Sequence, residues 1–75
     1  MSQDIFLSNR LILANNVKTL RHNLKLRREE LSLALGFDNS YISKLEKCKI
    51  NITIDKLTLI ANYFNVEIAD LLKKS

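Results

Sequence analysis

The chain has 75 residues, of which 47% are apolar and 27% charged, with one glycine, one cysteine and no proline. A chain of this length forms one domain, so residues 1–75 are expected to fold as a single compact unit. The scarcity of glycine and proline argues against long irregular loops and favours an all-α domain. A single cysteine excludes an internal disulfide, and no spacing of metal ligands is present, so no metal or cofactor is expected.

Membrane insertion and catalysis are also not expected. No apolar run approaches the roughly 20 residues that a membrane-spanning helix needs, and the first residues lack the basic-then-apolar pattern of a signal peptide. We therefore expect a soluble, cytoplasmic protein. His22 is the only histidine, no nucleophile motif is visible, and one glycine cannot build a phosphate-binding loop. The protein is therefore not expected to be an enzyme.

Residues 1–7 are predicted to be a short N-terminal arm, with Ser8 capping a first helix that ends near Leu24. Apolar residues recur there at steps of three and four, which predicts an amphipathic helix: Leu11, Ala14, Val17, Leu20 and Leu24. A second apolar set exceeds what one stripe requires: Ile5, Phe6, Leu7, Ile12 and Leu13. Either this set makes a broad contact with the core, or the arm covers a neighbouring or partner subunit.

The stretch 28–47 predicts two short helices with a tight corner between them. In the first helix three apolar residues share one face: Leu31, Ala34 and Leu35. Gly36 follows where a helix commonly ends in a left-handed residue, and Asp38 stands where a cap for the second helix is expected. In that second helix Ile42 and Leu45 point inward, and the outward positions are polar: Asn39, Ser40, Ser43, Lys44 and Lys47. Such a presented helix is typical of a helix-turn-helix, in which the second helix enters the major groove of DNA.

Two more helices are expected after a loop over residues 49–53. Thr53 or Asp55 can cap the fourth helix and Asn65 can end it. Its apolar face is predicted to contain Leu57, Ile60, Ala61 and Phe64. A fifth helix is expected from about Glu67, with an inward face of Ile68, Leu71 and Leu72.

The positive charge is concentrated on the helix pair. Between residues 18 and 49 there are eight basic and four acidic residues, and the rest of the chain has four of each, so the whole net charge of +4 lies in that segment. Such a distribution is expected of a surface that faces a polyanion.

Motifs across about residues 12–73 carry a family resemblance. They are Leu20-Arg21, Glu30-Leu31, Leu35-Gly36, Ser40 to Glu46, Asn51, Leu57, Ile60-Ala61 and Leu71-Leu72. This ordered set resembles the phage-repressor helix-turn-helix family, which includes lambda repressor and Cro and is also called XRE. The resemblance implies a compact five-helix DNA-binding domain and an ion pair between Arg21 and Glu46.

The chain departs from the family pattern at several turns. The family usually has glycine near Lys25, serine or threonine at Arg27, glycine at Cys48 and often proline at Ile52. If the turn shapes are kept, Cys48 should adopt a positive φ. The helix that follows Arg27 should lack a cap worth about 1 kcal/mol.

The resemblance, together with side-chain chemistry, predicts which residues contact DNA. Base contacts are expected from Asn39, Ser40 and Lys44, with Ser43 close by. Asparagine can pair with adenine and lysine can donate to guanine. Phosphate contacts are expected from Arg27, Arg28, Lys47, Lys49 and Asn51. Tyr41 is expected to pack on the core.

Apolar residues near the C-terminus predict a homodimer, because they exceed what a small core should absorb: Leu57, Ile60, Phe64, Val66, Ile68, Leu71 and Leu72. The expected partners are double-stranded DNA, a second copy and, as a further candidate, RNA polymerase. The predicted function is a sequence-specific transcriptional regulator on a palindromic operator. The short length and the Asn51-Ile52-Thr53 loop resemble the controllers of restriction–modification systems. A Cro-like phage repressor, an antitoxin, and a protein-interaction module without DNA binding stay open as alternatives.

Overall fold

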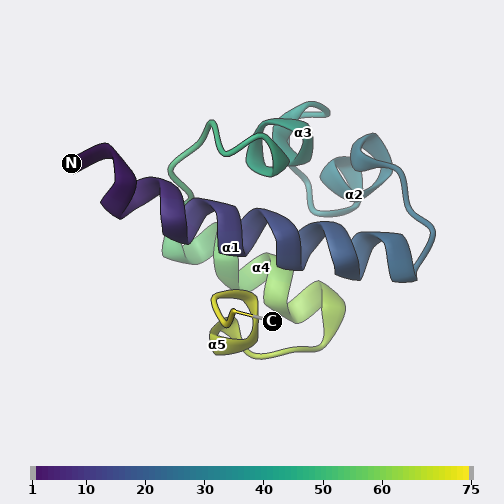
Figure 1. Ribbon diagram of the computed structural model, residues 1–75. Coiled ribbons are helices and arrows are strands. Elements are labelled where there is room, and N and C mark those ends of the chain that lie inside the picture. Colours follow the sequence, from purple (N-terminus) through teal and green to yellow (C-terminus); the bar gives the residue numbers. More distant parts are fainter. Residues whose placement is uncertain (1, 75) are drawn as a thin grey trace.

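A computed structural model describes residues 2–74, and it contains five helices and no strand in that part of the chain (Figure 1). In chain order they are α1 Ser2–Asn23, α2 Arg28–Ala34, α3 Tyr41–Glu46, α4 Ile54–Phe64 and α5 Ile68–Leu71. The predicted all-α class is confirmed. Within these residues no helix has both the length and the apolar character needed to cross a membrane.

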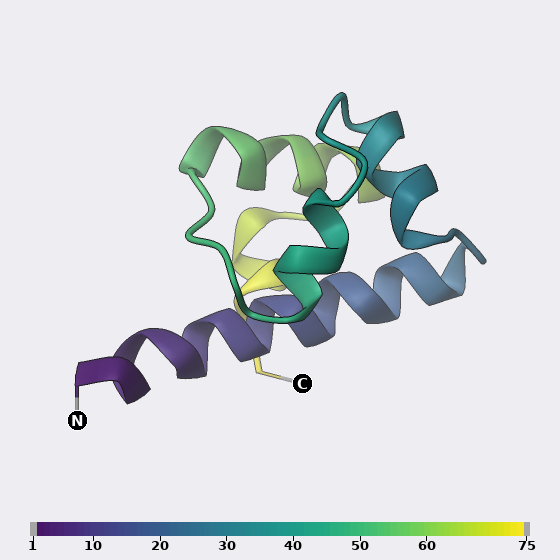
Figure 2. The ribbon, with the colours of Figure 1, turned by 90° about the horizontal axis from the view of Figure 1, so that it is seen from above.

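The first helix begins earlier than the sequence predicted. The expected arm over residues 1–7 is wrong for its described part, because α1 begins at Ser2 and runs through Ser8, which is therefore not a cap; Met1 lies outside the described residues. No glycine or proline interrupts this segment, and each residue added to an existing helix gains a hydrogen bond without a new nucleation step. The first turns of α1 extend beyond the rest of the fold (Figure 2).

The buried face of α1 also differs from the prediction. The buried side chains are Leu13, Ala14, Val17 and Arg21, whereas Leu11 and Leu24 are about half exposed. Leu20 is partly buried against the core. The buried face of α1 includes the side chain of Arg21. Because the prediction used apolar residues only, it placed the buried face at the wrong angle around the helix.

A buried serine joins α2 to α3. The hydroxyl of Ser32 donates to the carbonyl of Arg28 at 2.9 Å and accepts from the amide of Ile42 at 3.0 Å. Ser32 and Leu31 are both fully buried, whereas Ala34 is exposed, so the predicted inward role of Ala34 is wrong. Ile42 is buried in α3 as predicted, and so is Leu45.

The turn between these helices is longer than expected. Gly36 has φ +77, as predicted for the end of α2. The carboxylate of Asp38 accepts from the amide of Ser40 at 3.3 Å and from its hydroxyl at 2.6 Å. These hydrogen bonds stabilise a turn at Asn39 and Ser40, and α3 begins only at Tyr41. Asn39 and Ser40 therefore precede α3 instead of lying within it.

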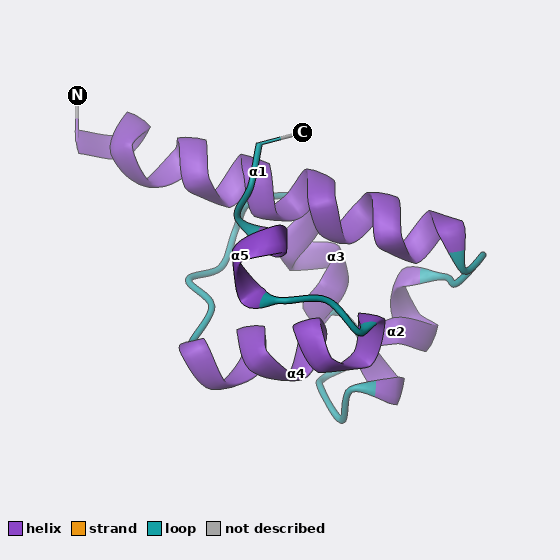
Figure 3. Ribbon diagram, turned by 90° about the horizontal axis from the view of Figure 1, so that it is seen from below, coloured by secondary structure: helices purple, strands orange, loops and turns teal. Residues whose placement is uncertain are grey.

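The last two helices close the core against α1. Thr53 caps α4 by accepting from the amide of Lys56 at 3.2 Å, and Asn65 ends it with φ 57, both as predicted. Figure 3 shows α5 between α4 and α1. The side-chain amide of Asn16 on α1 donates to the carbonyls of Leu71 at 2.8 Å and Lys73 at 2.9 Å. One side chain of α1 thus binds carbonyl groups at the end of α5, which have no partner inside the helix.

Candidate nucleic-acid interface

The predicted base-contact residues lie around the start and the outer side of α3. Asn39 and Lys44 are exposed, and Ser40 and Ser43 are partly exposed. The Ser40 hydroxyl gives its proton to Asp38, so it can only accept from a further partner. Hydrogen bonds from the hydroxyl and then the amide of Ser40 lower the pKa of Asp38, because both stabilise its charged form.

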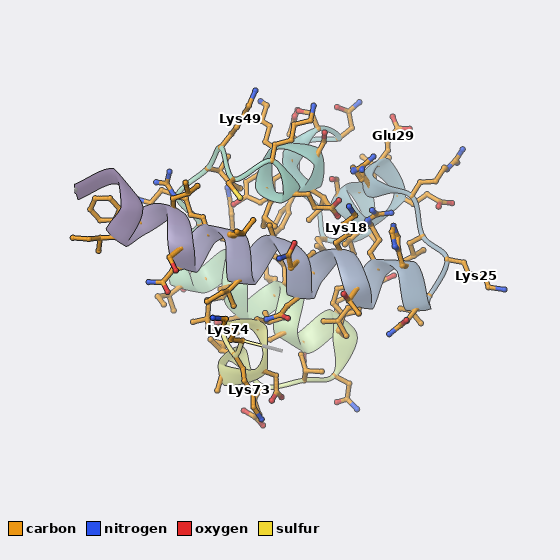
Figure 4. The ribbon with its side chains drawn as sticks, viewed as in Figure 1. Lys18, Lys25, Glu29, Lys49, Lys73 and Lys74 are labelled. Carbon is orange, nitrogen blue, oxygen red and sulfur yellow. The ribbon has the colours of Figure 1, made fainter. Side chains whose placement is uncertain are left out.

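The predicted phosphate-contact residues are all exposed, and they flank α3 on two sides: Arg27 and Arg28 at the start of α2, and Lys47, Lys49 and Asn51 after α3. Figure 4 shows Lys49 and Glu29 at the edge formed by α2 and α3, while Lys73 and Lys74 lie beside α5 at the opposite edge. Lys25 points away from the molecule at the turn between α1 and α2 (Figure 4). Not every basic residue of segment 18–49 therefore faces the same way as α3.

A buried ion pair connects α1 to α3. Glu46 accepts from the Nε of Arg21 at 2.8 Å and from its Nη2 at 3.1 Å, and both side chains are about 5% exposed. The planar guanidinium suits two parallel bonds of this kind. Arg21 also donates to the carbonyl of Leu26 at 2.8 Å, which fixes the turn before α2. The ion pair expected from the family resemblance is therefore present.

Glu46 has a second arginine partner that the sequence did not predict. The Nε of Arg28 lies 3.0 Å from Oε1 of Glu46, and the Arg28 side chain is 50% exposed. Burial alone would raise the pKa of Glu46, but the hydrogen bonds from Arg21 and Arg28 outweigh burial and hold this pKa below its ordinary value. Arg28 is thus held beside the end of α3 with part of its guanidinium exposed.

The start of α2 is capped from inside the helix. Arg27 occupies the N-cap position of α2, and its side chain has no acceptor for the free amides of the first turn. The backbone amide of Arg27 donates to the carboxylate of Glu30 at 2.7 Å. That hydrogen bond from the Arg27 amide lowers the pKa of Glu30. The Arg27 side chain is 78% exposed, with its Nε 3.5 Å from the same carboxylate. The expected loss of a serine or threonine cap is real, and Glu30 offsets part of it.

Comparison with known proteins identifies this arrangement. A helix-turn-helix family model matches residues 17–71. The chain belongs to the XRE-type helix-turn-helix family. It is 30% identical to the control protein C.SmaI of Serratia marcescens over 69 residues, which are 92% of this chain and 82% of that protein.

Two solved structures have the same fold. The hypothetical transcription factor NHTF from Neisseria superimposes with a TM-score of 0.84 at 30% identity, over 88% of this chain and 76% of that one. The restriction–modification controller C.AhdI from Aeromonas hydrophila gives 0.77 at 22% identity, over 85% of this chain and 97% of that one. The protein is a helix-turn-helix DNA-binding regulator, with α2 and α3 as the helix pair.

The turns keep the family's shape although the glycines are missing. Lys25 has φ 57 and Cys48 has φ 61, so both occupy the left-handed region that favours glycine. The positive φ predicted for Cys48 is confirmed. Each such residue costs about 1–2 kcal/mol in backbone strain. Cys48 is a half-buried free thiol.

An aromatic cluster near the start of α3 was not predicted. The rings of Phe37 and Tyr41 lie 4.7 Å apart, and the Nζ of Lys56 lies 4.6 Å from the Tyr41 ring and 5.6 Å from the Phe37 ring. Burial raises the pKa of Tyr41. The cluster joins the turn before α3 to α4. No local spacing in the sequence could have revealed it, because Lys56 lies far from both rings along the chain.

His22, the histidine considered in the sequence analysis, is exposed, and its Nε2 lies 3.1 Å from the guanidinium of Arg21.

The predicted dimer residues need a correction. Leu57, Ile60 and Leu71 are at most 3% exposed within one chain, so they belong to its own core and cannot form a surface between subunits. Phe64, Val66 and Ile68 are partly buried against that core. Leu72, which was expected to point inward as well, is 46% exposed. The small core absorbs more apolar side chains than the sequence analysis allowed.

Proposed function

We propose that this protein is a sequence-specific transcriptional regulator that places α3 in the major groove of DNA. The observation that carries this proposal is the pairing of an exposed Asn39 and Lys44 with a buried Ile42 and Leu45. The apolar side of α3 is thereby fixed in the core, and its polar side is left to a partner. Asn39 suits the N6 and N7 edge of adenine, and Lys44 suits O6 and N7 of guanine.

Phosphate contacts hold α3 in register. Arg27, Arg28, Lys47, Lys49 and Asn51 are the residues proposed for them, and their exposed positions around α3 support this role. Such contacts fix the orientation of the protein on the duplex but carry no sequence information. The Arg21–Glu46 ion pair helps to fix the angle of α3 against α1, because both side chains are buried and two hydrogen bonds connect them.

The regulated genes are those of a restriction–modification system. This part of the proposal rests on the likeness to the control protein C.SmaI over most of both chains. The protein acts as a homodimer on a palindromic operator, since a two-fold dimer presents two copies of α3 about one DNA turn, or 34 Å, apart. RNA polymerase is the further partner of a regulator that activates.

The test is footprinting of the protein on the DNA upstream of its own gene. The expected result is protection of two inverted half-sites about one helical turn apart. Uniform weak protection along the fragment would contradict a sequence-specific regulator. Protection of one half-site only, at every protein concentration, would contradict the homodimer but not the reading role of α3.

A further inference from the structure

A hollow of about 360 Å³ lies beneath the first turns of α1, next to the end of α3. Its apolar lining comes from three places: Phe6 and Leu13 on α1, Leu45, Ile50 and Ile52 around the loop after α3, and Leu72 after α5. In Figure 2 the first turns of α1 pass beyond the α3–α4 loop, with no other helix alongside them. The hollow is therefore an extension of the core that the described side chains do not fill.

The hollow has exposed apolar side chains at its rim, next to the polar side chains of Asn9, Arg10 and Asn51. Among the residues that line it, Phe6 is 61% exposed and Leu72 46%. From Ile5 onward, the first buried side chain of α1 is Leu13. Apolar groups gathered at one place on a small protein usually mark an interaction site.

We infer that the hollow is the docking surface for a second copy of this chain, and that the first turns of α1 from each copy fill the hollow of the other. This inference rests on the proposed homodimer and deepens it. An interface related by a two-fold axis must contain the same patch on both subunits. Here a hollow and an apolar projection lie side by side on one patch, so the patch is complementary to itself.

The available area agrees with such a contact. Phe6 and Leu72, which line the hollow, each expose on the order of 100 Å² of apolar surface. About 200 Å² per subunit supplies part of the apolar centre of a standard interface, which buries roughly 800 Å² per partner. The dimer is therefore expected to be moderate in strength and to be stabilised by simultaneous binding to two half-sites of DNA.

The position of the hollow also suits the geometry of DNA binding. Asn51, proposed to contact phosphate, lies at its border, as does Leu45 from α3. A two-fold axis that passes beside the end of α3 and runs along the direction in which α3 is presented would leave both copies of this helix on the same side of the dimer. The buried residues of α4 are not needed for this contact, in agreement with their place in the core.

The hollow-facing and opposite sides of α1 can be tested separately with a matched pair of variants. Phe6 and Leu11 have similar exposure, 61% and 50%, but they lie about 140° apart around a helix of 3.6 residues per turn. Phe6→Ser should weaken the dimer about a hundredfold in sedimentation equilibrium, roughly tenfold for each copy of the ring removed. Leu11→Ser should leave the dissociation constant within about twofold of the wild type.

The outcomes separate this inference from the proposed function. A wild-type dimer that Phe6→Ser leaves intact, or that Leu11→Ser weakens more, would overturn the docking surface while the homodimer stands. A wild-type chain that stays monomeric, both free and on DNA, would instead overturn the homodimer itself.

A fluorescent variant gives a second readout that does not depend on destabilisation. The chain contains no tryptophan, so Phe6→Trp would report on this position alone. Its emission should shift to the blue as the concentration rises through the dimerisation range, because the ring leaves water. An unchanged emission while sedimentation shows the dimer forming would overturn the inference.

Discussion

Replacing Arg21 with alanine should destabilise the fold by about 3 kcal/mol, the lower end of the 3–5 kcal/mol cost of breaking a buried ion pair. The variant loses two hydrogen bonds to Glu46 and one to the carbonyl of Leu26. The carboxylate that remains is 5% exposed. It keeps one hydrogen bond, from Arg28, and for this reason we expect the lower end of the range.

Arg28 provides the matched control, because it binds the same carboxylate from the surface. Its side chain is 50% exposed, and exposed ion pairs contribute about 0–1 kcal/mol. A 75-residue domain has a total stability of roughly 4–11 kcal/mol, so Arg21→Ala removes a large share and Arg28→Ala little. In thermal melts followed by circular dichroism, Arg21→Ala should lower Tm by roughly 12–24 °C, and Arg28→Ala by less than about 8 °C.

The pH dependence gives an independent check of the same residues. The pKa of Glu46 is lower in the folded state than in the unfolded chain. Its contribution to stability is therefore present above the ordinary glutamate pKa of about 4.3 and is lost as the pH falls through the folded-state value. Glu46→Gln should reduce the loss of stability in acid.

The comparison of the two arginine variants can also refute this assignment. If Arg21→Ala and Arg28→Ala lowered stability equally in the thermal melts, Arg21 would not be the buried partner of Glu46.

Three further predictions concern single side chains. Asn16→Ala should cost about 1–2 kcal/mol in urea unfolding, because carbonyls at the end of α5 lose their donor; an unchanged midpoint would show that water replaces the amide without cost. Ser32→Ala should cost about 1–3 kcal/mol, since the buried amide of Ile42 loses its acceptor, whereas retained stability would argue against this link between α2 and α3. Lys25→Gly and Cys48→Gly should each stabilise the fold by about 0.5–1 kcal/mol, because glycine adopts the left-handed conformation without strain. A loss of stability in both would mean that the side chains contribute more than the strain costs.

The sequence predicted the parts of the fold that depend on local chemistry. Gly36 and Asn65 end their helices, Thr53 caps α4, and Ile42 and Leu45 face the core, all as expected. Each of these follows from backbone conformation, a single hydrogen bond or a three-residue spacing. The pairing of α1 with α3 through a buried arginine came only from the family resemblance, because an arginine within a helix has no signal that distinguishes a buried position from an exposed one.

Prediction from the sequence was wrong where the role of a residue depends on distant parts of the chain. Leu57 and Leu71 carry the same apolar signal whether they fill their own core or a dimer contact, since both places remove them from water. Ser32 looks like a surface residue, and only the approach of Ile42 explains its burial. The start of α1 was misplaced because no residue before Ser8 actively stops a helix.

In the proposed function, α3 reads the DNA sequence while its neighbours hold the phosphates. The most direct measurement compares the affinity of wild type, Lys44→Ala and Asn39→Ala for the cognate operator and for random duplex DNA, across a range of salt concentrations. Each of these two changes should cost roughly 1–3 kcal/mol on the operator and little on random DNA.

The same titrations with Arg28→Ala and Lys49→Ala complete the measurement. Each should weaken binding to both duplexes about equally and reduce the slope of log affinity against log salt by about one unit, as one fewer counterion is released. Lys49 is included because Arg28 also binds Glu46. If Lys44→Ala kept the full preference for the operator while Arg28→Ala and Lys49→Ala abolished it, α3 would not be the reading helix, and the account of this protein as a sequence-specific regulator through α3 would be contradicted.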